Sequence, residues 1–241
     1  MEEAMPKLTT GQICQLIEID RAGDGIGNLV QELIIRLTSG GVAGKMTDPR
    51  GTMAKRLWDR GFGRDSAIKA KNFKAYLAAI PQIPASLIAE DSDLSLLSLA
   101  DPRPGLLRAC QLLGIQYEEL GYADGDAEPF DERFMIPAAP FWFRHDDGRA
   151  NSNRRPDHCR DELATGDIQV GTATEGIFAF AHHPQIVVEG EHIIDLPGTV
   201  HHSRRVHCAY LRVWSGRVGL DLSGDSGFAD PSYGALRVRR K

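Results

Sequence analysis

Apolar residues recur at helical spacing through the first third of the chain. The pattern predicts about four short helices over residues 8–80, at 13–17, 28–37, 48–61 and 73–80. Asp48 and Pro49 form an N-cap and first-turn pair for the third helix, and Gly40-Gly41 ends the second. Their apolar stripes indicate core contacts.

The composition of the chain changes near the segment Pro81-Gln82-Ile83-Pro84. Two prolines there bracket a short turn and stop the preceding helix. All eight histidines lie between His145 and His207, and no lysine occurs between Lys74 and Lys241. These observations predict a helical N-terminal region over residues 1–80 and an α+β domain over residues 81–241.

Beyond this boundary the hydrophobic period shortens to that of strands. Strands are predicted at 85–89, 94–100, 139–145, 186–188, 192–196, 206–214 and 217–222, the last two joined by the turn Ser215-Gly216. Helices are predicted at 104–113, from Pro156 onward, and at 172–184, where Thr172 and Glu175 form a capping box. Residues 121–132 read as an acidic loop. The fold class is α+β, with a helical N-terminal part followed by a mixed, largely antiparallel sheet with packed helices.

Composition narrows the class of protein. With 241 residues, 42% hydrophobic and 25% charged, the chain is typical of globular proteins. Its start is acidic and no apolar segment follows, which is not the pattern of a signal peptide. No run approaches the roughly 18 uncharged residues of a membrane-spanning helix. We therefore expect a cytoplasmic protein with no membrane partner. Four scattered cysteines, Cys14, Cys110, Cys159 and Cys208, predict reduced thiols.

Three glycine-rich segments resemble functional loops but lack what the chemistry needs. Residues 23–27 lack the third glycine of a dinucleotide loop, and residues 40–45 have the wrong spacing for a phosphate loop. Residues 224–227 copy the Gly-Asp-Ser-Gly segment of chymotrypsin-like proteases, but the earliest histidine is His145 and no preceding barrel is predicted. All three are interpreted as turns.

The histidines form the one cluster that suggests a metal. His145 and Asp146 end a strand at a turn, His183 ends a helix, and His201 and His207 precede or enter a long strand, so three segments can converge on one ion. The residue types fit zinc. The alternative assigns these residues to helix capping, turns and the surface, because no HExxH, HxxxH or HxH spacing occurs.

Two further features allow a functional and a structural interpretation. Cys159 lies in the first turns of a predicted helix between Arg155 and Arg160, where a thiolate is conceivable, but the residue is more typical of a small buried apolar group. Arginines gather over residues 144–160 and 237–240. Local acids balance them and the net charge is −5, so nucleic acid is not expected as a partner.

Several turn and cap segments carry a family resemblance. Over about residues 83–238, Pro140-Phe141, the start of the helix at Thr172, His183-Pro184, Asp195-Leu196-Pro197-Gly198 and Ala229-Asp230-Pro231 resemble an uncharacterised bacterial family of unknown function. The resemblance implies a bacterial cytoplasmic source and an α+β second part. It implies no activity and no catalytic residues.

Two functions from different classes follow from these patterns. The first is a non-catalytic binding or interaction protein with a protein or small-molecule partner. It is favoured because no candidate catalytic motif has the residue spacing that its chemistry requires. The alternative is a metal-dependent, zinc-type hydrolase that uses His145, Asp146, His183, His201 and His207. Metal content discriminates between the two.

Overall fold

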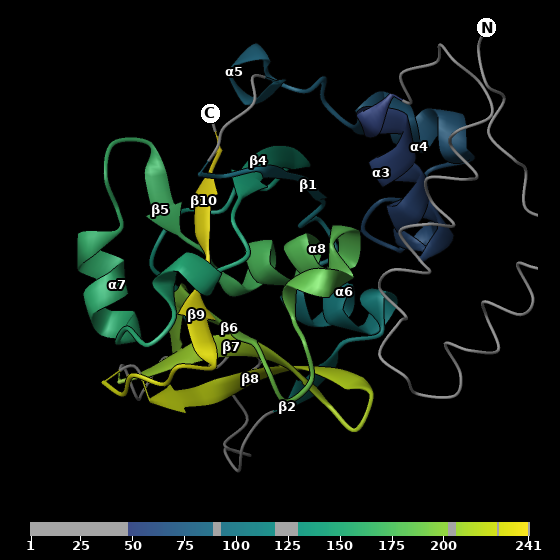
Figure 1. The fold of residues 1–241 in the computed structure, drawn as a ribbon. Coiled ribbons are helices and arrows are strands. Elements are labelled where there is room, and N and C mark those ends of the chain that lie inside the picture. Colours follow the sequence, from purple (N-terminus) through teal and green to yellow (C-terminus); the bar gives the residue numbers. More distant parts are fainter. Residues whose placement is uncertain (1–47, 89–92, 119–129, 202–205, 226, 241) are drawn as a thin grey trace, which may run out of the picture. The chain divides into compact units, whose positions relative to one another are not determined.

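The computed structural model describes residues 48–88, 93–118, 130–201, 206–225 and 227–240 (Figure 1). All of them belong to one compact unit that begins at Asp48. The helices predicted at 13–17 and 28–37, and the glycine segments 23–27 and 40–45, lie outside the described residues. Two sheets and their packed helices confirm the α+β class.

Helices open the described part of the chain, as the sequence predicts. They are α3 (Pro49–Asp59), the 3-10 turn η1 (Phe62–Arg64), α4 (Phe73–Ala79) and α5 (Ala85–Ile88). The side chain of Asp48 accepts a hydrogen bond from the backbone N of Arg50, and that of Asn72 accepts one from the N of Ala75, so both longer helices carry side-chain N-caps. The predicted strand at 85–89 is wrong: a short apolar run after a proline fits one helical turn equally well.

The side chains of these first helices share the main hydrophobic cluster with the sheets. Leu57, Phe62 and Tyr76 are fully or almost fully buried in the same cluster as Trp142 and Phe178. Apolar burial on this scale is the main favourable term in folding. The division of the chain into residues 1–80 and 81–241 stays a prediction, because residues 1–47 are not described.

The first sheet is antiparallel and has four strands in the order β1-β4-β10-β5. They are β1 (Leu96–Ala100), β4 (Phe141–His145), β10 (Arg237–Arg239) and β5 (Ile168–Val170). Strand β4 lies between β1 and β10, with Leu97 opposite Arg144 and Val238 opposite His145, and all five of its residues are buried. The structure confirms strands within the predicted segments 94–100 and 139–145, whereas the three-residue strands β5 and β10 carry too little pattern to be found.

The second sheet is mixed and has the order β2-β8-β7-β6-β3, with β9 also paired to β6. The strands are β2 (Gln116–Glu118), β3 (Phe130–Glu132), β6 (Ile193–His201), β7 (His207–Trp214), β8 (Arg217–Asp225) and β9 (Tyr233–Ala235). The predicted hairpin is confirmed, with Trp214 opposite Arg217. Two predictions are wrong: residues 130–132 of the expected acidic loop form β3, and residue 186 ends the 3-10 turn η3 (Pro184–Ile186) instead of starting a strand.

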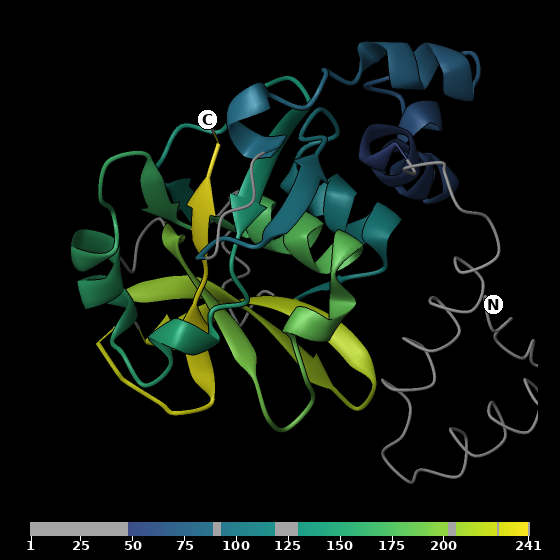
Figure 2. The same ribbon diagram turned by 45° about the horizontal axis from the view of Figure 1, so that its top comes forward.

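Helix α8 (Ala173–His182) lies between the two sheets and touches both, with α6 (Leu106–Leu113) beside it (Figure 2). Eight of its ten residues are buried, as expected for a helix inside a core. Its predicted capping box is confirmed: Glu175 N donates to Thr172, and Thr172 N donates to Glu175. A Cβ at Gly176 would stand 2.6 Å from Leu196, so a glycine lets the helix approach β6.

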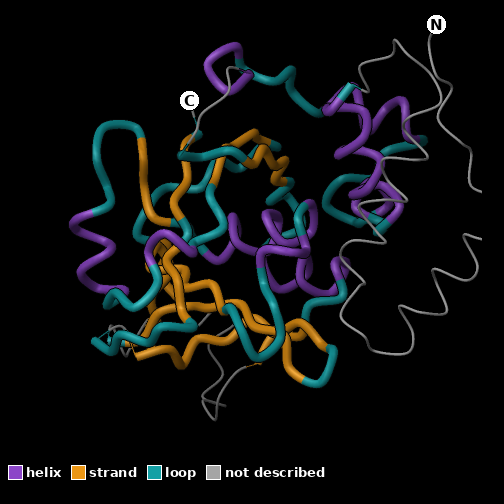
Figure 3. Tube along the Cα trace, viewed as in Figure 1, coloured by secondary structure: helices purple, strands orange, loops and turns teal. Residues whose placement is uncertain are grey.

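Helix α7 (Pro156–Glu162) and the 3-10 turn η2 (Arg149–Asn151) follow β4 (Figure 3). The predicted start of a helix at Pro156 is confirmed. Within the described ranges, no helix is both long and apolar enough to cross a membrane.

Candidate functional site

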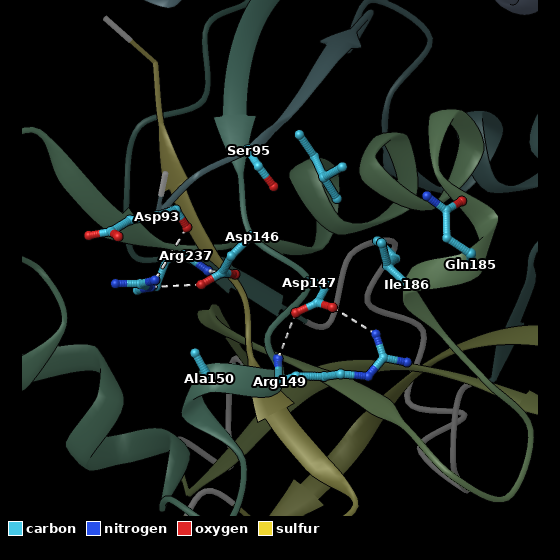
Figure 4. Close-up of a pocket in the computed structure, with 10 residues that line it drawn as sticks. Asp93, Ser95, Asp146, Asp147, Arg149, Ala150, Gln185, Ile186 and Arg237 are labelled. Carbon is cyan, nitrogen blue, oxygen red and sulfur yellow. Dashed lines mark hydrogen bonds and ion pairs between the residues drawn. The ribbon is translucent and has the colours of Figure 1, made fainter. Parts of the chain in front are cut away.

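A cavity of about 400 Å³ opens where the chain entering β1, the turn after β4, η3 and β10 meet (Figure 4). Charged and uncharged polar side chains dominate its lining. The charged residues are Asp93, Asp146, Asp147, Arg149 and Arg237, and the uncharged polar residues are Ser95 and Gln185. Since sites for small molecules are usually concave and hold a few convergent polar groups, this cavity is the candidate functional site.

Asp146 forms the fixed part of the lining. Its carboxylate accepts hydrogen bonds from Nε and the backbone N of Arg237 at 2.7 and 3.0 Å, and from the N of Gly148 at 3.1 Å. Asn151 Nδ2 approaches at 3.4 Å. Burial raises the pKa of Asp146, although the hydrogen bonds and charge of Arg237 act in the opposite direction. A buried carboxylate with this many donors is held in one position.

The turn that carries these residues depends on Gly148. Its φ of +79° lies in the left-handed region, and a Cβ there would stand 2.7 Å from the carbonyl oxygen of Gly234. Only glycine meets both conditions without strain. The turn thereby brings Asp146, Asp147 and Arg149 to the cavity from one short segment.

Asp147 and Arg149 form a second ion pair, which lies at the solvent-exposed side of the cavity. Nη1 of Arg149 lies 2.7 Å from Oδ2 of Asp147, and the side chains are 46% and 38% exposed. Burial raises the pKa of Asp147, but the hydrogen bonds from Arg149 outweigh it, so the pKa lies below its usual value. Nε2 of the buried His192 donates to the carbonyl oxygen of Asp147 at 2.8 Å, which fixes the backbone beneath an exposed side chain.

Several polar groups of the lining keep unused hydrogen-bonding capacity. In the described part of the chain, Nη1 of Arg237 and Nε and Nη2 of Arg149 donate to no other residue. The hydroxyl of Ser95 and the amide of Gln185 likewise have no partner among the described residues. Both arginines of the lining therefore keep spare N–H donors.

Of the residues predicted to bind a metal, His145 and His183 lie close together. Their ring centroids are 5.4 Å apart. Nδ1 of His145 donates to the carbonyl oxygen of Asp146 at 2.7 Å, its Nε2 lies 2.9 Å from the hydroxyl of Ser98, and Nε2 of His183 donates to the carbonyl oxygen of Leu97 at 2.8 Å. A carbonyl oxygen can only accept, so these hydrogen bonds fix the tautomers of both rings.

His201 and His207 form a second pair, with ring centroids 6.5 Å apart. They belong to β6 and β7 of the mixed sheet, whereas His145 belongs to β4 of the antiparallel sheet. Asp146 is paired with Arg237. Among the described residues no group of three or more His, Cys, Asp or Glu side chains is arranged to hold a metal ion, and the zinc site stays a prediction.

Cys159 is the other titratable candidate from the sequence. It is fully buried, and burial raises the pKa of its thiol to about 11, while the charge of Arg154 lowers it only in part. This confirms the interpretation as a buried apolar residue. Cys110 and Cys208 are also buried.

The arginines of the two basic segments are mostly engaged within the protein. Arg144 is buried and donates to carbonyl oxygens of residues 87, 94 and 95 at 2.8–3.3 Å. Arg155, Arg237, Arg239 and Arg240 form ion pairs with carboxylates. These pairs reduce the positive field that nucleic acid would require. The segment 224–227 includes Ser226, which lies outside the described residues.

The sequence singled out Asp146 only as a candidate metal ligand, and it did not indicate most of the cavity lining. Asp147 reads as turn chemistry, and Arg149 and Arg237 read as part of a solvated basic surface. The signal that was present is the Asp-Asp-Gly turn at the end of a buried strand, a place where functional side chains often occur.

Comparisons with protein-family models, with curated proteins and with solved structures give no match to this chain. The resemblance to an uncharacterised bacterial family therefore stays a prediction.

Proposed function

We propose that this chain is a non-catalytic binding protein whose ligand is a small polar molecule held in the cavity beside Asp146. One observation carries the proposal: five charged residues from three separate segments converge on a single cavity of about 400 Å³. This volume falls within the range of roughly 300–1,000 Å³ that is typical of small-molecule sites.

The state of the lining carboxylates supports binding over catalysis. A general base works best when its pKa lies near the working pH and when it is free to take a proton. Burial raises the pKa of Asp146, but its carboxylate already accepts hydrogen bonds from Arg237 and Gly148, and the pKa of Asp147 is lowered. The residues that line the cavity include no histidine, cysteine or lysine. The zinc-dependent alternative stays a hypothesis without an observation in its favour.

A cavity-filling variant tests the proposal. Ala150 is an exposed residue of η2 that lines the cavity, and Ala164 is an exposed residue that does not. A panel of amino acids, sugars, carboxylic acids and polyamines is screened by ligand-detected NMR against wild type, Ala150→Trp and the control Ala164→Trp.

We expect at least one class to bind to wild type and to Ala164→Trp but not to Ala150→Trp, because the indole occupies the space of the ligand. Binding that is equal in all three proteins, or no binding from any class, contradicts the proposal. Thermal unfolding of each variant shows that a loss of binding does not come from misfolding.

A further inference from the structure

Asp195 is a buried acid whose carboxyl group has no hydrogen-bond partner. It lies in β6 between Ile194 and Leu196, which belong to the main hydrophobic cluster, so its side chain is on the opposite face of the strand. Asp195 is only 3% exposed, and among the described residues no N–H or O–H group donates to its carboxyl oxygens. Buried carboxylates normally accept several hydrogen bonds, so this site favours the protonated, neutral acid.

A second carboxylate strengthens this preference. Asp230 lies in the turn before β9, and hydrogen bonds from the N and the hydroxyl of Ser232 hold its pKa below the usual value, so Asp230 is ionised at neutral pH. Burial, together with the charge of Asp230, raises the pKa of Asp195 to about 7.

The other titratable or charged side chains near Asp195 do not supply a counter-ion. On its own face of β6 the neighbouring elements carry Tyr210, Arg212, Asp221, Tyr233, Cys159 and Arg160. The remaining neighbours, β3 and α8, carry Asp131, Glu132 and Glu175. The two arginines among them are engaged elsewhere, because Arg212 pairs with Asp221 and Arg160 donates to the carbonyl oxygen of Pro197. Of all these charges, that of Asp230 is the one that shifts the pKa of Asp195.

Strand β9, which lies beside β6 (Figure 1), connects Asp195 to the candidate cavity. Ala235 of β9 pairs with Asp195, and its carbonyl oxygen accepts a hydrogen bond from Nδ2 of Asn151 at 3.1 Å. Two residues later, the N of Arg237 donates to the carboxylate of Asp146 at 3.0 Å. The same short segment therefore contacts Asp195 on one side and holds the fixed ion pair of the cavity on the other.

Loss of the proton from Asp195 puts a second negative charge beside Asp230, in a site without donors. Repulsion between the two carboxylates and the need of a buried charge for water both act to separate β9 from β6. Strand β9 has three residues and pairs with β6 alone among the described strands, so it is the element that yields most easily.

We propose that Asp195 is a proton-sensitive switch for the cavity: when it loses its proton, β9 loosens from β6 and the contacts of Asn151 and Arg237 that hold Asp146 weaken. This inference rests on the proposed binding function and adds its regulation. The cavity keeps the described geometry below about pH 7 and loosens above it.

An NMR titration of the full chain from pH 5.5 to pH 8.5 tests the switch. The carboxyl 13C signal of Asp195, assigned by its loss in Asp195→Asn, reports the protonation, and the backbone amide of Arg237 and the side-chain amide of Asn151 report the cavity. In wild type we expect all three signals to move with one midpoint at about pH 7. In Asp195→Asn, which keeps the shape of the neutral acid, this step of the two amide signals should be absent.

Amide hydrogen exchange measures the loosening itself. The exchange rate of the Leu236 amide, which donates to the carbonyl oxygen of Asp195, is divided by the rate in Asp195→Asn at the same pH, so that the intrinsic pH dependence of exchange cancels. This ratio should rise threefold or more from pH 6 to pH 8.

Two further variants make the test specific. Asp230→Asn removes the neighbouring charge and should move the midpoint of the Arg237 signal toward acid, even if Asp195→Asn does not fold. Glu132→Gln is the matched control, because burial also raises the pKa of Glu132 to about 7 but this residue lies on β3, so the step of the Arg237 signal should stay in place.

Three results overturn the inference: an Asp195 carboxyl signal that does not titrate in this range, cavity signals that do not follow it, or a step that persists in Asp195→Asn. None of these measurements uses a ligand. The binding function is therefore judged separately, by the screen of compound classes, and either proposal can fail while the other stands.

Discussion

His145 is fully buried, and replacing it should change how the stability of the protein depends on pH. Burial lowers the pKa of its imidazole to about 3, the carbonyl oxygen of Asp146 opposes this, and the charges of His183 and His182 add to it. In the unfolded chain the pKa returns to about 6.5. The informative variant is His145→Asn, which keeps a donor near Nδ1 and removes the titrating group.

The sign of the effect follows from where the proton binds. As the pH falls below about 6.5, the unfolded chain takes up a proton at His145 and the folded protein does not, so stability is lost toward acid. One proton taken up only by the unfolded chain lowers the free energy of unfolding by about 1.4 kcal/mol per pH unit. Because of His145, the free energy of unfolding of wild type should therefore fall by about 2 kcal/mol from pH 7.5 to pH 5. Because the folded pKa lies well below pH 5, this figure depends little on its exact value.

Other groups make the pH dependence of wild type alone uninformative. Burial raises the pKa of Glu132 and of Asp195 to about 7. A raised folded pKa contributes stability at low pH that is lost as the pH rises through about 7, which opposes the effect of His145. The difference between wild type and the variant cancels these contributions.

Urea unfolding at pH 7.5, 6.5, 5.5 and 5.0 measures this difference. Wild type should be the more stable protein at pH 7.5, and the gap between it and His145→Asn should shrink by about 2 kcal/mol at pH 5. Two controls accompany it: Ser98→Ala removes the hydroxyl beside Nε2, and His158→Asn removes an exposed imidazole. Neither should show a gap that shrinks toward acid. A gap that stays constant for His145→Asn refutes the reasoning, since it means that His145 is protonated equally in both states.

Three further predictions follow from single sites. Arg144→Met should lower the free energy of unfolding by about 2–4 kcal/mol in urea, because it leaves several buried carbonyl oxygens without a donor; a loss below about 1 kcal/mol contradicts this. Gly148→Ala should destabilise the protein more than Gly166→Ala in the same assay, since both have a positive φ but only the Cβ at Gly148 meets a backbone atom; equal losses show that the close approach is absent. Elemental analysis of protein purified without chelators should find no stoichiometric zinc; one zinc per chain that is lost in His145→Ala and in His201→Ala supports the hydrolase instead.

Elements with local signals could be read from the sequence. The cap at Asp48-Pro49 and the capping box of Thr172 and Glu175 lie within one turn of helix, so both helices were predicted close to their observed starts. The hairpin of β7 and β8 was predicted because its strands are long and a tight turn joins them. Strands β5, β9 and β10, in contrast, have three residues each, and their hydrogen-bond partners lie far away in the chain. These strands therefore carry no local signal from which they could be predicted.

The candidate site was predicted least well, for the same reason. Asp146 and Arg237 are separated by 91 positions and meet only because β10 pairs with β4. The histidines looked like one metal cluster because they are close in sequence, but the structure places the four predicted metal-binding histidines in two pairs, His145 with His183 and His201 with His207, and no group of three arises among the described residues.

The amino-acid sequence alone determined the α+β class, the helix starts and the long hairpin, because each depends on contacts between residues a few positions apart. Only the tertiary structure decided which charges line the cavity, which histidines become neighbours and which arginines are neutralised. Those outcomes depend on strand order and register, which bring together residues whose separation along the chain carries no local signal.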